Sequence, residues 1–319
     1  MNKKTNLLLI IATALVLVGG VLFCIAMTGL NWDFTKLSTV RYETNTHPIG
    51  LPFDNIVIET DTADIRLVSA ETPSVTCYEQ ENAKHSVFVE DGTLYIKVQD
   101  DMQWYERIGV NFGTPKITVY IPKGLYDTLQ IKGSTGDVTI PSEFRFASLD
   151  ITQSTGDIKC QASVTGNVNI TASTGNIHLE NMQAYAIRLS VSTGKITLRD
   201  VTCEANLNIR LSTGDTTLTN VSCKNLETTA DTGDLSLCSV IASGNFFIER
   251  TTGDITFDRC DAAQIKVLTD TGDVTGTLLS PKVFIYQTDT GRVELPKTTT
   301  GGTCDITTDT GNIKIKIVN

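Results

Sequence analysis

Short runs of alternating apolar and polar residues recur through the C-terminal part of the chain, always in the same register around a Thr-Gly pair. Apolar residues stand seven and five positions before the glycines, with Thr228 the one polar residue at these positions. Apolar residues stand again two and four positions after each glycine, where only Thr216 and Gly276 interrupt the pattern. Consecutive glycines lie 19 or 20 residues apart. The glycines of these repeat turns are Gly136, Gly156, Gly175, Gly194, Gly214, Gly233, Gly253, Gly272, Gly291 and Gly311.

Alternation with a period of two predicts half-buried strands, because successive side chains of a strand point to opposite faces. Self-similarity at a period of about 20 residues predicts a solenoid of stacked units. We therefore predict an all-β, parallel and right-handed β-helix, with two strands per coil joined at the Thr-Gly corner. Strands of successive coils are expected to pair, so about ten coils spaced about 4.8 Å apart give a rod of roughly 48 Å.

The repeat template appears once more, in degenerate form, at residues 54–68, which we interpret as a first coil. Residues 86–98 alternate around Asp91-Gly92, a dipeptide typical of hairpin turns. Residues 116–121 form a further predicted strand before Pro122. We expect residues 49–131 to form an N-terminal β coil with a hairpin and a capping loop, and 132–319 to hold the regular repeats.

Three large aromatic residues, Trp104, Tyr105 and Phe112, lie in the loop 100–114. An exposed aromatic loop on a rod is a candidate recognition surface, so these residues are candidate binding residues. The alternative is that the rings plug the open end of the solenoid, which needs a cap over its terminal apolar ladder. We favour the cap and keep the binding loop as the alternative.

The N-terminus contains an uncharged segment of 24 residues, 7–30, preceded by Lys3 and Lys4. As a helix it spans about 36 Å, enough for a hydrocarbon core of about 30 Å. We predict an uncleaved signal anchor, with residues 1–6 cytoplasmic, 31–48 a polar tether, and the rest extracytoplasmic at a bacterial cell membrane. A cleaved signal peptide is the alternative.

The formal net charge of −10, with charges of both signs, argues against nucleic acid as a partner. Seven cysteines follow the apolar segment, and their odd number and irregular spacing do not describe a disulfide framework. Cys203 and Cys223 share a register one coil apart. The distance of about 4.8 Å between paired strands therefore allows a disulfide bond between them. We favour free thiols packed in the core.

Aspartates line the Thr-Gly corners, and stacked carboxylates repel one another. A calcium ion between coils would relieve this repulsion, with Asp231, Asp234, Asp254, Asp270 and Asp273 as candidate ligands. Solvated turn residues are the interpretation that we favour, so we predict no metal and no cofactor. The repeated Asp-Thr-Gly resembles the aspartic-protease tripeptide, but that chemistry needs two such loops facing each other. We assign no catalytic residues.

The anchor, the degenerate first coil, the Asp91-Gly92 hairpin, the strand end at Val119–Pro122 and the repeated Ser-Thr-Gly-Asp together resemble a known bacterial family. This family comprises membrane-anchored β-strand-repeat proteins of unknown function labelled "putative adhesin". The resemblance covers residues 45–319. It implies an extracytoplasmic β-solenoid, sometimes linked to envelope stress, and supplies no catalytic residues.

The leading hypothesis is therefore a non-enzymatic β-solenoid at the cell envelope that binds wall or surface glycan, or an envelope protein. Its contact surface would be the threonine row beside the glycines. The alternative is a membrane-anchored scaffold or envelope-stress signalling module. A polysaccharide-active β-helix enzyme is the remote alternative, because the histidines His47, His85 and His178 are far apart in the repeat pattern.

Overall fold

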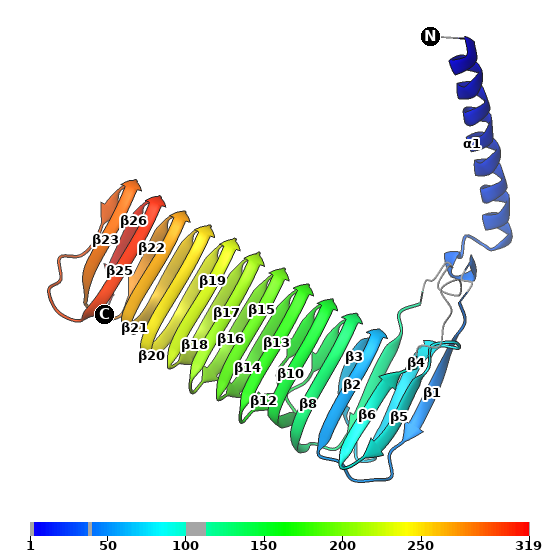
Figure 1. The fold of residues 1–319 in the computed structure, drawn as a ribbon, viewed down its shortest axis with the longest axis horizontal. Coiled ribbons are helices and arrows are strands. Elements are labelled where there is room, and N and C mark those ends of the chain that lie inside the picture. Colours follow the sequence, from blue (N-terminus) through cyan, green and yellow to red (C-terminus); the bar gives the residue numbers. More distant parts are fainter. Residues whose placement is uncertain (1–2, 38–39, 100–112, 319) are drawn as a thin grey trace.

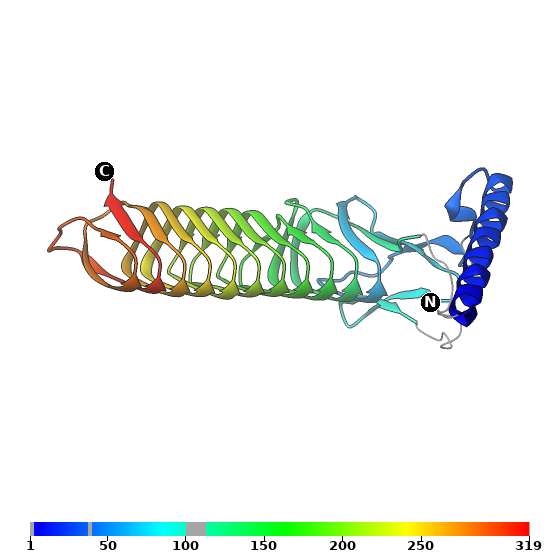
Figure 2. The ribbon, with the colours of Figure 1, turned by 90° about the horizontal axis from the view of Figure 1, so that it is seen from above.

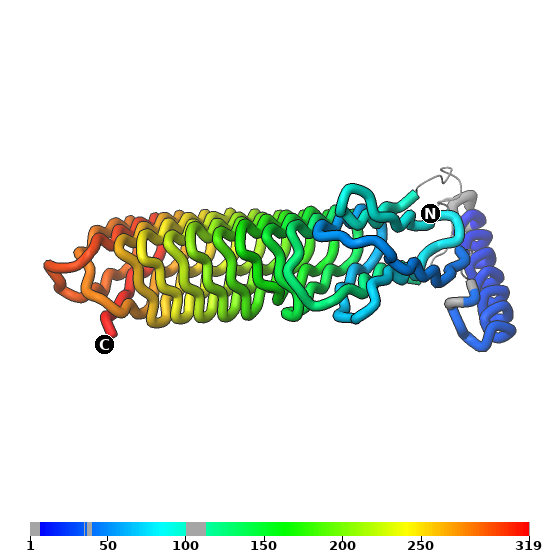
Figure 3. Tube along the Cα trace, turned by 90° about the horizontal axis from the view of Figure 1, so that it is seen from below, coloured from blue at the N-terminus to red at the C-terminus, as the bar shows by residue number. Residues whose placement is uncertain are grey.

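The computed structural model describes residues 3–37, 40–99 and 113–318 and shows one N-terminal helix followed by a long β-solenoid (Figures 1 and 2). Helix α1 (Lys3–Gly29) precedes the short 3-10 helix η1 (Phe34–Leu37). Within α1, Leu7–Gly29 is long and apolar enough to cross a membrane, and all of its residues are exposed except Met27. The helix lies at one end of the rod and the C-terminus near the other (Figure 3).

Strands make up nearly all of the remaining chain, which confirms the predicted all-β solenoid. The strands of the N-terminal part are β1 (Tyr42–Pro48), β2 (Asn55–Thr62), β3 (Asp64–Ser69), β4 (Ser74–Gln80), β5 (His85–Glu90), β6 (Thr93–Val98) and β7 (Lys116–Ile121). The strands of the repeat array are β8 (Gly124–Thr135), β9 (Val138–Ile140), β10 (Phe144–Thr155), β11 (Ile158–Cys160), β12 (Ser163–Val164), β13 (Asn167–Thr174), β14 (Ile177–Ala184), β15 (Ala186–Thr193), β16 (Ile196–Cys203), β17 (Asn206–Thr213), β18 (Thr216–Cys223), β19 (Asn225–Thr232), β20 (Leu235–Thr252), β21 (Ile255–Thr271), β22 (Val274–Leu278), β23 (Lys282–Thr290), β24 (Val293–Glu294), β25 (Gly302–Thr310) and β26 (Ile313–Ile317).

Strands of neighbouring coils pair in parallel, in the register that the apolar columns predict. Leu149 stands beside Val168, and Ile158 stands beside Ile177. The columns stack into one continuous core cluster along the rod. A further column that is mostly buried, three residues before the glycine, is not predicted by the alternation around the corner. It consists of Thr60, Gly133, Gln153, Ala172, Val191, Leu211, Ala230, Arg250, Thr269, Thr308 and Thr288.

The corner glycines are required both by backbone conformation and by space. Gly214 has a φ of 137°, in the region that favours glycine. A Cβ atom built on Gly214 would lie 1.7 Å from the carbonyl oxygen of Gly194, the same position in the preceding coil. A coil can therefore stack on the preceding one at the strand spacing only where its own corner residue carries no side chain; Ala63 is tolerated because it belongs to the first coil.

The second bend of the coil lies six residues after the glycine and uses a left-handed residue. These residues have φ values of 51–54°, in a region that asparagine and aspartate tolerate better than other side chains. They are Asn181, Asp200, Asn220, Ser239 and Arg259. This second corner of the coil is thus a defined bend inside an almost continuous strand.

The order of coils in space departs from their order in the chain at both ends of the rod. At the proximal end, β2 pairs with both β6 and β8, so the first coil lies between the hairpin strand and the repeat array. At the distal end, β25 pairs with both β21 and β23, and β26 with both β22 and β24. The C-terminal coil is therefore inserted between its two predecessors (Figure 1). The expectation that successive coils always pair is wrong at these two places.

The segment 31–48, expected to be a polar tether, contains a strand. Strand β1 pairs antiparallel with β4, which pairs antiparallel with β7. The predicted hairpin is confirmed, since β5 and β6 pair antiparallel around Asp91 and Gly92, with φ values of 48° and 70°. Such positive values at both turn residues match the right-handed twist of hairpin strands.

Candidate functional site

A straight row of exposed threonines follows one edge of the rod, and we call it the threonine edge. Each threonine lies in register with those of the neighbouring coils; Thr174, for example, stands between Thr155 and Thr193. The neighbouring column holds exposed serine, aspartate or threonine. In spatial order, the threonine edge consists of Thr62, Thr135, Thr155, Thr174, Thr193, Thr213, Thr232, Thr252, Thr271, Thr310 and Thr290.

The residue after each glycine connects one coil to the next through a side-chain hydrogen bond. The backbone N–H of Asp157 donates to Asp137 Oδ1 at 2.8 Å, and the N–H of Asn176 donates to Asp157 Oδ1 at 2.8 Å. The same bond joins Asp273 to Asp254 and Asn312 to Asp273. We call this column the Asx ladder. Each carboxylate of the ladder has its charge stabilised by a backbone donor, which offsets repulsion along the row.

Two basic residues occupy ladder positions, and the structure explains one of them. Arg292 belongs to the terminal coil in space, so no later coil presents an N–H to it, and its own N–H donates to Asn312 Oδ1. Lys195 is internal. Its N–H donates to Asn176 Oδ1, but its side chain offers no acceptor to the next coil, where Asp215 follows. The Asx ladder is therefore interrupted after Lys195.

The calcium ligands considered from the sequence lie along this same edge. Asp234 Oδ1 and Asp254 Oδ1 each accept a backbone hydrogen bond of the Asx ladder. Calcium binding there stays an untested alternative to the prediction that no metal binds. Trp104, Tyr105 and Phe112 fall within 100–112, outside the described residues, so their role as binding residues also stays a prediction.

Arg250 is buried inside the rod, with 1% of its surface exposed. Its Nη2 donates to Thr216 Oγ1 at 3.2 Å and to Thr228 Oγ1 at 3.1 Å. The threonine that interrupts the apolar column at 216 is thus a hydrogen-bond partner of this guanidinium. Burial lowers the pKa of Arg250 to about 10, although Asp215 and Asp234 favour its charged form. Arg250 Nε and Nη1 have no partner among the described residues, so the charge is costly to the fold.

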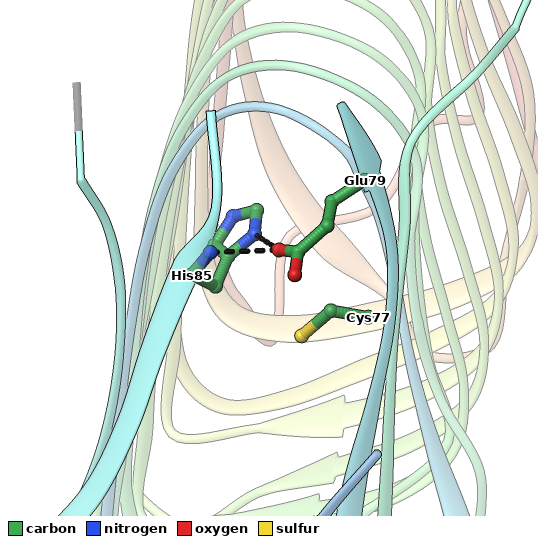
Figure 4. A group of neighbouring side chains, drawn as sticks. All are labelled: Cys77, Glu79 and His85. Atoms are coloured by element: carbon green, nitrogen blue, oxygen red, sulfur yellow. Dashed lines mark hydrogen bonds and ion pairs between the residues drawn. The ribbon is translucent and has the colours of Figure 1, made fainter. Parts of the chain in front are cut away.

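A second polar group lies at the N-terminal end of the rod, where Cys77, Glu79 and His85 come together (Figure 4). Strand β4 directs Cys77 and Glu79 inward from alternate positions, and His85 begins β5. Cys77 is fully buried, and Glu79 and His85 are 1% and 6% exposed. Burial, then the charge of Glu79, raises the pKa of the Cys77 thiol to about 12. We call these three residues the Cys-Glu-His cluster.

Hydrogen bonds fix the acidic and imidazole groups of this cluster. His85 Nδ1 lies 2.7 Å from Glu79 Oε2, which also accepts the backbone N–H of His85 at 2.7 Å. His85 Nε2 lies 3.0 Å from Thr60 Oγ1, and Asn45 Nδ2 donates to Glu79 Oε1 at 2.8 Å. Strands β1, β2, β4 and β5 are thereby joined at one point.

A small cavity adjoins the cluster and is lined by Thr60, Glu79 and His85, together with Pro115 and Val98. Its volume is about 60 Å³, enough for bound water. A chain of hydroxyl, imidazole and carboxylate can activate a nucleophile. Small-molecule sites, however, usually enclose several hundred cubic ångströms, so this cavity suits water or an ion better than an organic substrate.

Sequence reasoning missed this cluster, because it treated the three histidines as unrelated. Cys77 and Glu79 stand two apart, which places them on one face of any strand, but no periodic pattern marks 74–80 as a strand. The approach of His85 depends on the chain reversal after Gln80, where the backbone N–H of Ala83 donates to Gln80 O, and the repeat pattern does not predict this reversal.

Residues 53–316 match the family model described as Toastrack DUF4097. The chain belongs to the Toastrack DUF4097 family. This Toastrack match spans the whole solenoid from the first coil to the last and confirms the resemblance found in the sequence. No curated protein matches the chain.

Solved structures share the Toastrack solenoid at low sequence identity. A "putative lipid binding protein" from Parabacteroides distasonis is 18% identical with a TM-score of 0.50, covering 76% of this chain and 98% of its own. A "putative adhesin" from Parabacteroides merdae is also 18% identical with a TM-score of 0.50, covering 73% of this chain and 96% of its own. These likenesses show the fold alone.

Proposed function

We propose that this Toastrack protein is a non-enzymatic, membrane-anchored rod at the outer face of a bacterial cell, which binds a repetitive envelope glycan along its threonine edge. The observation that carries the proposal is the uninterrupted row of exposed, in-register threonines from Thr62 to Thr290. Hydroxyls repeat at the strand spacing of about 4.8 Å, so a polymer with regular hydroxyl or amide groups can be contacted at many points.

Charge along the edge narrows the class of ligand. The membrane-proximal half presents mainly serine beside threonine, whereas Asp231, Asp270, Asp309 and Asp289 stand beside it in the distal half. Carboxylates there disfavour phosphate-rich polymers and favour neutral or cationic glycans. Hydroxyl and carboxylate groups also suit the many donors of a sugar chain.

The membrane orientation is part of the proposal. Helix α1 carries Lys3 and Lys4 at its start, and basic residues favour the cytoplasmic side of a membrane helix. The rod then extends from the outer face. Accessibility of a C-terminal tag tests this orientation. Protease or antibody should reach the tag on intact cells. If the cell wall covers the rod, the tag should become accessible in protoplasts. Protection in both would contradict the orientation.

Binding to the threonine edge can be tested with a matched pair of variants. Thr174→Val with Thr193→Val removes two neighbouring hydroxyls of the edge, while Thr152→Val with Thr171→Val removes two exposed hydroxyls from the strand face beside it. If each hydroxyl contributes about 1 kcal/mol, the edge variant should bind purified wall glycan about tenfold or more weakly. Equal binding by both variants and the wild type would refute the threonine edge as the contact.

A second candidate function is a scaffold or envelope-stress signalling module that acts through its ends. The distal end favours it, because Ile285 and Tyr286 on the terminal strand β23 are 54% and 55% exposed. Deleting residues 177–215 removes two coils in register. A scaffold should keep its activity after this deletion, whereas an adhesive edge should bind glycan more weakly.

A further inference from the structure

We propose that Cys77, Glu79 and His85 form a zinc-binding site at the membrane-proximal end of the rod. The Cys-Glu-His cluster is the group of potential metal ligands that converges within the described residues, with all ligand atoms within 4.8 Å of one another. The site is separate from the threonine edge, so it does not depend on the proposed glycan binding.

Small side-chain shifts would let the cluster hold the ion: His85 Nδ1 and Glu79 Oε2, now 2.7 Å apart, must separate slightly, while the other ligand separations already lie within 4.8 Å. Zinc binds sulfur at about 2.3 Å and nitrogen or oxygen at about 2.0–2.2 Å, so tetrahedral ligand atoms lie roughly 3–4 Å apart. Cys77 and Glu79 project from the same face of one strand, and His85 faces them from β5 (Figure 4). The backbone thus presents three ligands to one point without rearranging the sheet.

The kinds of ligand select the metal. A thiolate, an imidazole and a carboxylate together suit zinc, which is borderline in softness, whereas calcium and magnesium prefer oxygen ligands only. All three side chains are at least nine-tenths buried, so the site is shielded from bulk water. A buried thiol beside a carboxylate is unfavourable as a free anion, and a divalent cation would neutralise both charges.

Surrounding residues orient the ligands as metal sites require. Thr60 Oγ1 holds His85 Nε2 at 3.0 Å, which leaves Nδ1 facing Glu79. Asn45 Nδ2 holds Glu79 Oε1 at 2.8 Å, leaving Oε2 toward the histidine. Such outer hydrogen bonds fix ligand orientation and raise affinity.

The fourth ligand would be water from the adjoining cavity of about 60 Å³, which Glu79 and His85 both line. Zinc would displace the Cys77 thiol proton, and the proton on Nδ1 of neutral His85 would pass to Nε2, whose N–H can donate to Thr60 Oγ1. Binding to the ionised Glu79 therefore releases one proton and forms one bond each to sulfur, nitrogen and oxygen.

The test uses the full-length protein in detergent with a phosphine reductant. Titration with Co²⁺ should give a thiolate-to-cobalt charge-transfer band that saturates at one ion per chain, and equimolar Zn²⁺ should remove the band. Cys77→Ser should abolish the band, while Cys304→Ser, which changes another buried thiol at the far end of the rod, should leave it intact. Asn45→Ala should weaken binding about 10–100-fold.

X-ray absorption spectroscopy at the zinc edge, measured on the wild-type protein, tests the proposal even if Cys77→Ser fails to fold. The expected first shell contains one sulfur at about 2.3 Å and nitrogen or oxygen at about 2.0–2.2 Å. A first shell without sulfur, no stoichiometric uptake, or a cobalt band that survives Cys77→Ser would overturn the proposal. The cluster would then be a hydrogen-bonded network that joins strands and nothing more.

Discussion

The residue after each corner glycine links neighbouring coils by a bond that the strand ladders do not supply. Its side-chain oxygen must accept a backbone N–H from the next coil, so aspartate and asparagine suit the position and lysine does not. Arg292 is tolerated because no coil follows it in space. Polar residues at this edge are therefore part of the stacking interface as well as of the solvated surface.

Replacing Lys195 should stabilise the rod. Lys195→Asn supplies an acceptor for the N–H of Asp215, and one such hydrogen bond contributes about 0.5–1.5 kcal/mol. The ion pair that is lost, from Lys195 Nζ to Asp215 Oδ2 at 3.9 Å, is half exposed and contributes little. The denaturant midpoint should rise for Lys195→Asn and not for Lys195→Ala, which removes the charge without adding an acceptor.

The buried Arg250 network should be replaceable as a unit but not in part. Thr216→Val or Thr228→Val alone removes a partner of the guanidinium and should cost about 1–3 kcal/mol. The triple variant with Arg250→Met and both valines removes the charge together with its partners, and should be neutral or more stable by about 1–4 kcal/mol. Denaturant unfolding measures both. A triple variant with a lower free energy of unfolding than either single valine variant would contradict this account.

Buried thiols predict a loss of stability in alkali. Burial raises the pKa of Cys160 and Cys304 to about 12 from an ordinary value of 9.0. The folded state then holds these protons more tightly than the unfolded state. Their contribution is complete below pH 9 and is lost as pH rises toward 12, by up to about 1.4 kcal/mol per pH unit for each thiol. Unfolding midpoints from pH 8 to 11 test this, and Cys160→Ala should flatten the slope.

At the scale of the element, every coil repeats one register, and that property decides what sequence can and cannot predict. The columns containing Leu149 and Ile158 follow from alternation alone, as does the need for glycine at the corner. Coil order at the ends does not follow, because Phe284 and Cys304 occupy the same column and either coil could pair with Ile265. The Cys-Glu-His cluster could not be predicted either, because it lies on β4 and β5, antiparallel strands that do not follow the repeat.

The inserted C-terminal coil should contribute more to stability than its length suggests. It lies between β21–β22 on one side and β23–β24 on the other, so its removal exposes two sheet edges and separates the distal coil from the rod. Deletion of 302–319 should lower the melting temperature more than deletion of 177–215, which lets the remaining coils stack again. Greater exposure of β23 to proteolysis in the first variant would support this, and equal melting temperatures would contradict it.

At the scale of the whole molecule, α1 and the distal coil lie at opposite ends of one continuous core (Figures 1 and 3). The threonine edge follows the length of this core, and the Cys-Glu-His cluster is buried near the end that adjoins α1, where Thr62 of the edge lines the neighbouring cavity. The proposed glycan surface and the proposed zinc site thus use different side chains, so each proposal can be tested by variants that leave the other site unchanged.

The inserted coil also has a consequence for synthesis. Residues 282–294 leave the ribosome before residues 302–317. Yet β23 and β24, which lie in the earlier segment, are joined to the array only through their pairing with β25 and β26. The distal tip can take its place only after residues 302–317 have emerged. A chain that stops before them would therefore remain open at its tip, with an unpaired strand edge that proteases recognise. Completion of the rod would in this way depend on the synthesis of residues 302–317.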